Sequence, residues 1–309
     1  MKLYIKWFYG YKNFGDEIIF FGLLNYLQKE YNPESFVVEV GDLQWIQSRI
    51  QQNKTYLDLW ILDKLDFVEN SVISKRFRQL QIFLWIDKYR NYFKIFGWWE
   101  VLDESRKFPH DGRNLMILYR HDIRHKNFIL AWWIGTENKK RTKELFKYLF
   151  KKTQKVICRE QTSCERCQKY KTKSILLYQD FSKDILENQK NLIPQNSSKN
   201  KILINISPKH FNEDNLEKIQ KFVLKYPNHT KIFFPADVNF DKEFYPEIRK
   251  FLPDLQIYDW TKHPLSDTIS LFQSCDGWVG SRLHFLYPLK IFQKDFVSIS
   301  QSDKIKKML

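Results

Sequence analysis

With 309 residues, of which 43% are hydrophobic and 17% aromatic, the chain exceeds the usual size of one hydrophobic core, and its composition excludes a disordered protein. The net charge of +15, from 51 Lys and Arg against 36 Asp and Glu, favours an anionic partner: a phosphorylated metabolite, an acidic lipid surface or nucleic acid. No apolar run reaches the roughly 20 residues that span a bilayer, and residues 1–10 lack the layout of a signal peptide, so we expect a cytoplasmic location.

Strands and helices alternate through the first half of the chain. Apolar runs predict strands over residues 3–8, 35–40, 93–96, 127–134, 155–159 and 174–178. Helical spacing predicts helices over residues 16–31, 139–152 and 161–170. This alternation is typical of a parallel, doubly wound sheet.

Residues 187–200 (ENQKNLIPQNSSKN) are polar, contain proline and lack apolar periodicity, which predicts a linker. The alternation then restarts, with predicted strands at 201–207, 230–236, 255–260 and 276–280, and predicted helices at 212–226, near 241–251, at 266–275 and from about residue 282. We therefore predict an α/β fold with two Rossmann-like, doubly wound domains, residues 1–186 and 201–309, that face a ligand-binding cleft.

The four cysteines are too sparse for a disulfide framework: Cys158, Cys164, Cys167 and Cys275. Two of them have CxxC spacing, but the segment is predicted to be helical and has no second CxxC or nearby His pair. We expect buried free thiols and no metal site.

The stretch DGWVGSRLHFLYPLK, residues 276–290, places Arg282 and His284 in an apolar run, where a charge is costly without a partner. Both residues are predicted to lie where a strand turns into a helix, beside free backbone N–H groups that suit an anion. Arg offers a planar fork for carboxylate or phosphate, and His exchanges a proton near neutral pH. The alternative is an Arg that caps strand carbonyls and a His that is satisfied in the core.

The whole chain resembles the polysaccharide pyruvyl transferase family. The stretches that carry the resemblance, in the family's order and approximate spacing, are FYGYKNFGDEIIFFGLL (8–24), FGWWEVL (96–102), VICREQTSCE (156–165), YQDF (178–181), GSRLHFLYPLKIF (280–292) and SDK (302–304). GYxNxGDE and GSRLH, each after a predicted strand and at the start of a predicted helix, are the most specific of these.

The resemblance implies a GT-B-like architecture and transfer of the enolpyruvyl unit of phosphoenolpyruvate to sugar hydroxyls as a ketal, with release of phosphate and without a cofactor. The acceptor would be a cell-envelope polysaccharide, or an oligosaccharide or lipid-linked precursor, bound on the N-terminal side. The charge also leaves open a peripheral contact with the anionic inner face of the membrane. A nucleotide-sugar glycosyltransferase is the alternative, but the sequence shows no clear acidic or aromatic residues placed to bind a nucleoside. Nucleic-acid binding is disfavoured because the Lys residues are scattered.

The resemblance also suggests roles for individual residues. Arg282 and His284 match the family's RLH motif and would hold phosphoenolpyruvate, with His284 as an acid or as the partner of the leaving phosphate. Asp16, expected to face them from the other domain, is a candidate base or ligand of the acceptor hydroxyl. Asn13 and Gly15 belong to the same turn and are expected to bind substrate. The alternative for Asp16, and for its neighbour Glu17, is pairing with the helix dipole.

Three further basic residues are candidates for the anion pocket. Arg159 ends a predicted strand, Lys304 occupies a position where the family has a basic residue, and Lys209 follows the first strand of the second domain. Chance placement is the alternative for each of them, because the chain has 51 basic residues. We expect Asp180 to fix the turn into the linker.

Tryptophan stands where the family tends to have glycine, at Trp7, Trp98, Trp99, Trp132, Trp133 and Trp278. The chain has only 9 glycines, where average usage predicts about 22. Our hypothesis is that UGA codons of the gene encode glycine; the rivals are a sugar-stacking platform and burial of apolar bulk. UGG codons at these positions would exclude the first explanation. The family usually continues beyond SDKIKKML, so we also expect a C-terminal fragment.

Overall fold

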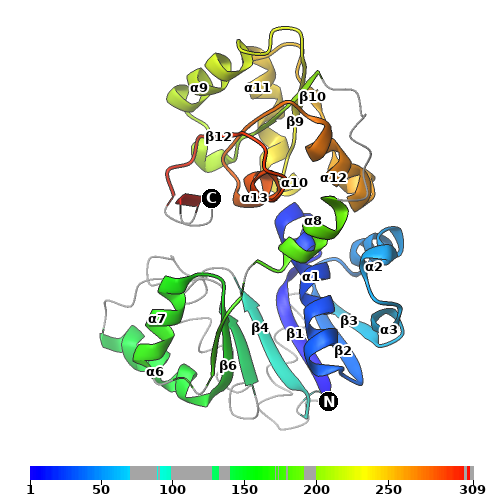
Figure 1. Cartoon of the computed structure of the whole chain (residues 1–309), viewed down its shortest axis with the longest axis vertical. Coiled ribbons are helices and arrows are strands. Elements are labelled where there is room, and N and C mark those ends of the chain that lie inside the picture. The colour runs from blue at the N-terminus through cyan, green and yellow to red at the C-terminus, as the bar shows by residue number, and fades with distance from the viewer. Residues whose placement is uncertain are drawn as a thin grey trace. The chain divides into compact units, whose positions relative to one another are not determined.

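The computed structural model describes residues 1–69, 89, 91–98, 127–131, 140–170, 172, 174–178, 180–190, 200–302 and 305–306. These residues form two compact units, each built on a parallel sheet (Figure 1). Unit 1 comprises residues 1–10, 24–47 and 57–180, and unit 2 comprises residues 11–23, 48–56 and 181–309. Two segments from the first part of the chain therefore belong to the C-terminal unit, whereas we expected a single boundary at residues 187–200.

Unit 1 holds a seven-stranded sheet in the order β3-β2-β1-β4-β5-β6-β7, with every neighbouring pair parallel. The strands are β1 (Lys2–Tyr9), β2 (Ser35–Val40), β3 (Leu65–Glu69), β4 (Phe93–Trp98), β5 (Asn127–Ala131), β6 (Thr153–Cys158) and β7 (Ile175–Leu177). The order reverses direction at β1, which is the doubly wound arrangement that the alternation predicted.

The helices that follow these strands are α1 (Phe14–Tyr31), α2 (Leu43–Gln52), the 3-10 turn η1 (Lys54–Tyr56), α3 (Leu59–Leu62), α6 (Lys140–Lys152) and α7 (Gln161–Lys169). Helix α1 is apolar on most of its circumference, and nearly all of its middle is buried. It ends at Asn32, whose φ of 38° is the left-handed conformation common after a helix.

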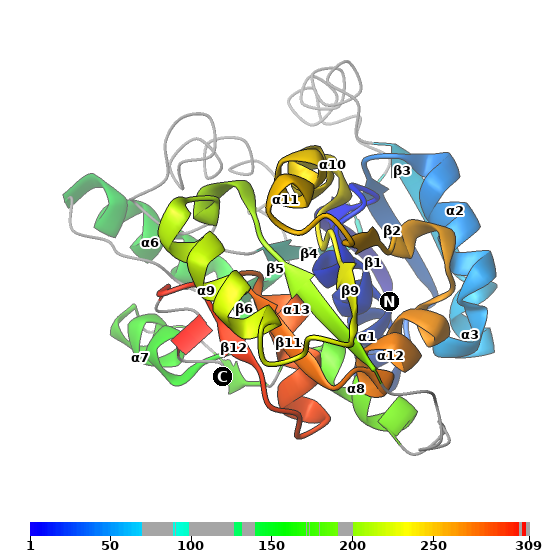
Figure 2. The same ribbon diagram turned by 90° about the horizontal axis from the view of Figure 1, so that it is seen from above.

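Unit 2 holds a five-stranded parallel sheet in the order β10-β9-β8-β11-β12 (Figure 2). Its strands are β8 (Lys201–Asn205), β9 (Thr230–Phe233), β10 (Gln256–Ile257), β11 (Gly277–Gly280) and β12 (Val297–Ser298). Its helices are α8 (Ser182–Lys190), α9 (Glu213–Val223), α10 (Val238–Asp241), α11 (Tyr245–Phe251), α12 (Leu265–Ser274) and α13 (Leu283–Ile291), with 3-10 turns η3 (Pro208–His210), η4 (Lys242–Phe244) and η5 (Trp260–Lys262). The predicted parallel α/β fold is confirmed.

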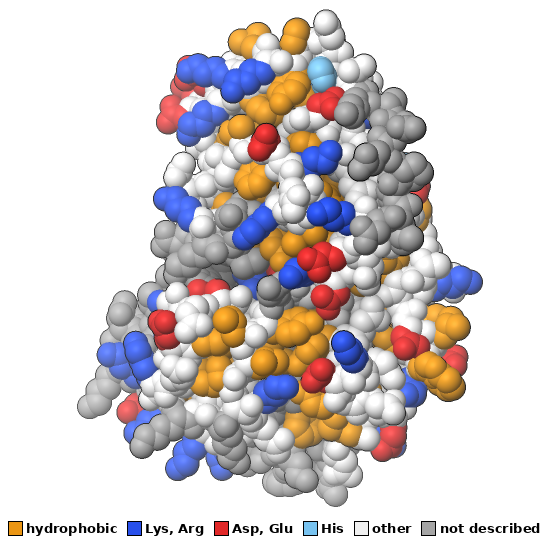
Figure 3. Space-filling view, viewed as in Figure 1, with side chains coloured by type: hydrophobic (Ala, Val, Ile, Leu, Met, Phe, Trp, Pro, Cys, Tyr) orange, Lys and Arg blue, Asp and Glu red, His pale blue; other side chains and the backbone are white. Residues whose placement is uncertain are grey.

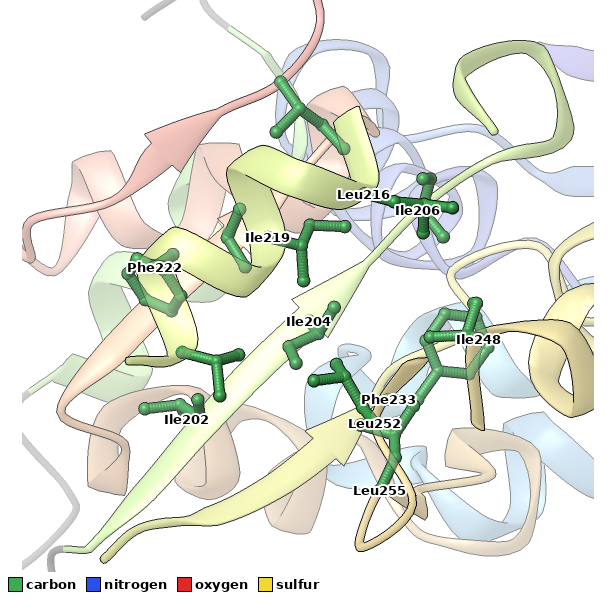
Figure 4. Close-up of a cluster of buried hydrophobic side chains, with 13 residues drawn as sticks. Ile202, Ile204, Ile206, Leu216, Ile219, Phe222, Phe233, Ile248, Leu252 and Leu255 are labelled. Carbon is green, nitrogen blue, oxygen red and sulfur yellow. The ribbon is translucent and has the colours of Figure 1, made fainter. Parts of the chain in front are cut away.

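One face of the unit 2 sheet packs against α9 and α11 (Figure 4). Ile202, Ile204 and Ile206 alternate along the chain from β8 and point to this face, as the two-residue period of a strand requires. The helices supply Leu216, Ile219, Phe222 and Val223 from α9 and Ile248 from α11, and Leu252 directly after α11 completes the layer. This buried layer holds the strands whose carboxyl ends carry the residues discussed below.

The opposite face is an aromatic cluster that includes the start of α1. The centre of the Phe14 ring lies 5.2 Å from that of Phe234, 5.6 Å from that of Trp260 and 5.7 Å from that of Phe272. Phe285 of α13 packs against Phe234 and Phe272. Phe14 itself is 1% exposed. Burial of this ring among unit 2 side chains explains why the first turns of α1 belong to unit 2.

The predicted linker overlaps α8, which runs to Lys190, while residues 191–199 lie outside the described part of the chain. The predicted strand at 255–260 is reduced to Gln256–Ile257, because Trp260 begins a 3-10 turn and its Nε1 donates to the carbonyl of Pro235 at 2.9 Å. Among the described residues, the helices that we did not predict are α2, α3, α8 and α10, of which α3 and α10 have only 4 residues each.

All four cysteines are free and buried, as predicted. Cys158 of β6 and Cys167 of α7 place their sulfur atoms 3.8 Å apart, and burial raises the pKa of Cys164 and of Cys275 to about 12. Among the described residues, no group of three or more His, Cys, Asp or Glu is arranged to hold a metal ion. Across the same residues, no helix has both the length and the apolar character needed to cross a membrane.

Trp278 of β11 is 1% exposed, and its indole Nε1 has no hydrogen-bond partner among the described residues. A buried N–H without an acceptor costs about 1–3 kcal/mol. The other tryptophans in question are Trp7 and Trp98, whose side chains are not among those described, and Trp99, Trp132 and Trp133, which lie outside the described residues.

Candidate functional site

The first turn of α1 is shaped by Asn13. Its side-chain Oδ1 accepts hydrogen bonds from the backbone N–H of Gly15 at 3.0 Å and of Asp16 at 3.3 Å, so it caps two of the free donors at the helix start. The preceding turn contains Gly10 with φ of 80° and Lys12 with φ of 57°. A lysine in this left-handed conformation is strained, and such strain is common at functional sites.

The same turn is fixed to the loop that follows β9. The Phe14 N–H donates to the carbonyl of Ala236 at 2.7 Å, and the Asn13 side-chain amide donates to Asp237 Oδ2 at 3.1 Å. Asn13 and Asp237 also form an isolated antiparallel bridge. We expected the NFGDE turn to belong to the first domain; instead these bonds make it part of unit 2.

Arg282 lies in the turn between β11 and α13, one residue after Ser281 and directly before the helix, as the strand-to-helix pattern predicted. Its backbone N–H donates to Asn205 Oδ1 at 3.1 Å, at the carboxyl end of the neighbouring strand β8. Ser281 Oγ accepts from the backbone N–H of Ser207 at 2.9 Å. These bonds join the turn after β11 to the loop after β8.

The guanidinium of Arg282 pairs with the carboxylate of Asp241 in α10. Arg282 Nε lies 3.2 and 3.3 Å from the two carboxylate oxygens, and Nη2 donates to Oδ1. The Asp241 side chain is fully buried, whereas that of Arg282 is 31% exposed. Asp241 thus orients the guanidinium, while Nη1 makes no recorded bond to any described residue. Arg282 is held by a carboxylate rather than by the strand carbonyls of the alternative.

His284 lies in the first turn of α13 and is 7% exposed. A Cβ atom added to Gly15 would stand 2.3 Å from His284 Nδ1, so the imidazole lies directly against the backbone of α1. The two most specific sequence motifs therefore meet within unit 2. Glycine at position 15 is required by this close approach rather than by backbone conformation, because only Gly10 among the described glycines has a positive φ.

Lys209 and His210 lie in η3, in the loop after β8. His210 Nδ1 is 2.9 Å from Ser207 Oγ, while Lys209 is exposed. Burial is the largest cause that lowers the pKa of His210, and the positive charges of Lys209 and Arg282 lower it further. The loop after β8 thus brings the Lys209 ammonium and the His210 imidazole within electrostatic range of Arg282. We named Lys209 from the sequence but not His210, which the position of its neighbour could have indicated.

Asp237 is a second residue that sequence reasoning missed. It is 8% exposed, its backbone N–H donates to Asp241 Oδ2 at 3.1 Å, and its Oδ1 has no hydrogen-bond partner among the described residues. Burial raises its pKa; the charge of Arg282 opposes this effect and that of Asp241 adds to it. An acidic residue directly after a predicted strand, in IFFPAD, was the available signal.

The remaining predicted site residues have different surroundings. Arg159 lies in unit 1, where Nη1 donates to Asp180 Oδ2 at 3.2 Å and both side chains are almost fully buried. Asp180 therefore has an ionic partner besides its place before α8. Asp16 is partly exposed in the first turn of α1, and Lys304 lies outside the described residues.

The Glu17 carboxylate forms an ion pair with Arg49, in addition to its place near the start of the helix dipole. Arg49 Nε donates to Glu17 Oε1 at 2.8 Å, and both side chains are 2% exposed. Arg49 Nη1 also donates to the carbonyl of His263 at 2.7 Å, and its guanidinium lies 5.5 Å from the centre of the Trp260 ring. Burial raises the pKa of Glu17, against the opposing effect of Arg49. This pair fixes α1, α2 and η5 together and is structural.

Comparison with known proteins supplies both a family and a fold. The sequence model described as "Polysaccharide pyruvyl transferase" matches residues 13–287. A search of curated proteins found no match.

Among solved structures, three UDP-N-acetylglucosamine 2-epimerases share the fold at low identity. The Rickettsia bellii enzyme has a TM-score of 0.59 at 10% identity, covering 96% of this chain and 78% of its own. The Methanocaldococcus jannaschii enzyme has a TM-score of 0.57 at 10% identity, covering 96% of this chain and 83% of its own. The Neisseria meningitidis enzyme bound to UDP-GlcNAc has a TM-score of 0.56 at 11% identity, covering 96% of this chain and 81% of its own. The fold is thus of the GT-B type.

Proposed function

Since the chain belongs to the polysaccharide pyruvyl transferase family, we propose that it transfers the enolpyruvyl group of phosphoenolpyruvate to hydroxyl groups of a cell-envelope polysaccharide or of its precursor. The product is a cyclic ketal, and phosphate leaves. The observation that carries the proposal is the meeting of Arg282, His284 and the capped turn at Asn13 in one compact unit.

Arg282 is prepared for an anion by its partner. Because Asp241 is bonded to Nε and Nη2, the guanidinium is held in one orientation, which lowers the entropy lost when an oxygen of the donor meets Nη1. The same pairing makes the Arg–Asp unit electrically neutral. Phosphoenolpyruvate carries both a phosphate and a carboxylate, so further donors are needed.

Lys209 and the start of α13 supply these donors. The exposed ammonium of Lys209 lies in the loop joined to the Arg282 turn, and the first N–H groups of α13 have no partner within the helix. We assign the contact with the leaving phosphate to His284 and acceptance of the hydroxyl proton to Asp16. The scattered Lys and Arg on the face shown in Figure 3 do not form the concentrated patch that nucleic-acid binding requires.

The test is release of phosphate from phosphoenolpyruvate by the purified protein with a panel of sugar, oligosaccharide and lipid-linked acceptors. Arg282→Ala and His284→Ala are expected to lose at least 100-fold in turnover while the fold stays intact. Arg249→Ala, on the exposed surface of α11, is the matched control and is expected to behave like the wild type. Undiminished turnover in both site variants would refute the assignment. Consumption of UDP-sugars without phosphate release would support a glycosyltransferase instead.

A further inference from the structure

Asp237 is a buried acid in the site, and one of its carboxylate oxygens has no hydrogen-bond partner among the described residues. Its Oδ2 accepts from the Asn13 amide, which holds the side chain, and its backbone N–H donates to Asp241 Oδ2, which holds the main chain. Oδ1 is buried and bonds to no described residue. A buried polar atom of this kind is costly, and such an atom often has a functional explanation.

The pKa of Asp237 is raised above its ordinary value. Burial is the largest cause and the Asp241 carboxylate adds to it, whereas the Arg282 guanidinium, the Asn13 amide and the backbone N–H of Asn239 oppose it. Arg282, which bonds to Asp241 through Nε and Nη2, is the largest of the influences that lower the pKa of Asp237. A protonated Oδ1 would be an O–H donor with no hydrogen-bond partner among the described residues.

We propose that Asp237 is the general acid that delivers a proton to the methylene carbon of the enolpyruvyl group. The assignment rests on the proposed function. It goes beyond the sequence reasoning, which considered only His284 as the acid, and it keeps the contact with the departing phosphate as the role of His284.

The proposed reaction uses two acceptor hydroxyl groups, and every bond and proton is accounted for in the following steps. The electron pair of the C=C bond takes the Oδ1 proton and forms the methyl C–H bond, which leaves the central carbon cationic. The first hydroxyl oxygen bonds to that carbon, and its proton passes through Asp16 to the phosphate oxygen as the C–O bond to phosphate breaks. The second hydroxyl oxygen closes the ketal, and its proton returns to Asp237. The acid is therefore restored after each turnover.

A purely structural role for Asp237 predicts a different result from a catalytic one. If Asp237 only ties the Asn13 turn to the loop after β9, an asparagine should replace it, since the amide oxygen still accepts from Asn13 and the backbone bond to Asp241 is unchanged. If Asp237 donates a proton, asparagine fails because an amide does not supply one.

The experiment compares wild type, Asp237→Asn, Asp237→Glu and Asp276→Asn in phosphate release and in binding of phosphoenolpyruvate. We expect Asp237→Asn to lose about 100-fold or more in kcat while binding phosphoenolpyruvate at least as tightly as the wild type. Glutamate should restore part of the rate. Asp276, which precedes β11 at the end away from Arg282, provides the same chemical change as a control and should leave kcat unchanged.

The pH profile gives a further readout that a structural role would not change. The wild-type kcat should fall as the pH rises through the raised pKa of Asp237, because the proton donor is lost, and this limb should be absent from Asp237→Asn. Activity of Asp237→Asn within threefold of wild type, or binding lost in parallel with kcat, would overturn the assignment alone. A wild type that releases no phosphate with any acceptor would refute the proposed function and this role with it.

Discussion

Gly15→Ala tests whether activity depends on the contact between α1 and His284. The added Cβ would lie 2.3 Å from His284 Nδ1, whereas ordinary contact begins at 3.4 Å, so the ring and the helix must separate by about 1.1 Å. A displacement of about 1 Å at a reacting group costs on the order of 100-fold in rate. We therefore expect turnover of phosphoenolpyruvate to fall about 100-fold.

Stability should change little, for two opposing reasons. Overpacking costs about 1–3 kcal/mol, and replacing a helical glycine by alanine returns up to about 1 kcal/mol. Urea unfolding measures the net effect. In the double variant with His284→Ala the ring atoms are gone and only the Cβ of residue 284 remains, 2.8 Å from the added Cβ, so Gly15→Ala should then cost less stability. Wild-type turnover in Gly15→Ala, or the same stability loss in both backgrounds, would refute the reasoning.

Arg49→Met should destabilise the protein by about 3–5 kcal/mol in urea unfolding, because it leaves Glu17 buried without its ionic partner; adding Glu17→Gln should recover part of that loss, and simple additivity would contradict the pairing. Lys209→Ala should raise the KM for phosphoenolpyruvate more than it lowers kcat, and an unchanged KM would remove Lys209 from the anion site. Cys164 and Cys275 should react with a thiol reagent only after urea unfolding, because burial raises their pKa; rapid labelling of the native protein would contradict this.

The glycine hypothesis also bears on the fold. Trp278 is buried in β11 and its indole N–H donates to no described residue, while Arg282 lies only four residues further along the chain. If Trp278 is a tryptophan, this burial places its bulk in the layer beneath the site rather than on a sugar-binding surface. The codon at this position distinguishes the two readings of the sequence.

The sequence alone determined the alternation of strands and helices, the parallel α/β class and the position of Arg282 between β11 and α13. Those features depend on local periodicity, which each segment carries by itself. Free, buried cysteines were predictable as well, since four in a chain of 309 residues are too sparse for a disulfide framework. The NFGDE and RLH motifs were recognisable because each combines a strand end with a helix start.

Only the tertiary structure decided which of these residues meet. Asn13 bonds to Asp237 across 224 positions of sequence, and Arg282 finds Asp241 through the turn that follows β9. Such pairs depend on how buried faces pack, and Phe14 shows the effect: its burial among unit 2 aromatics brings the start of α1 to His284. Local sequence patterns do not specify that packing. Asp237 could therefore be identified as a site residue only from the structure, which brings the loops that hold it together.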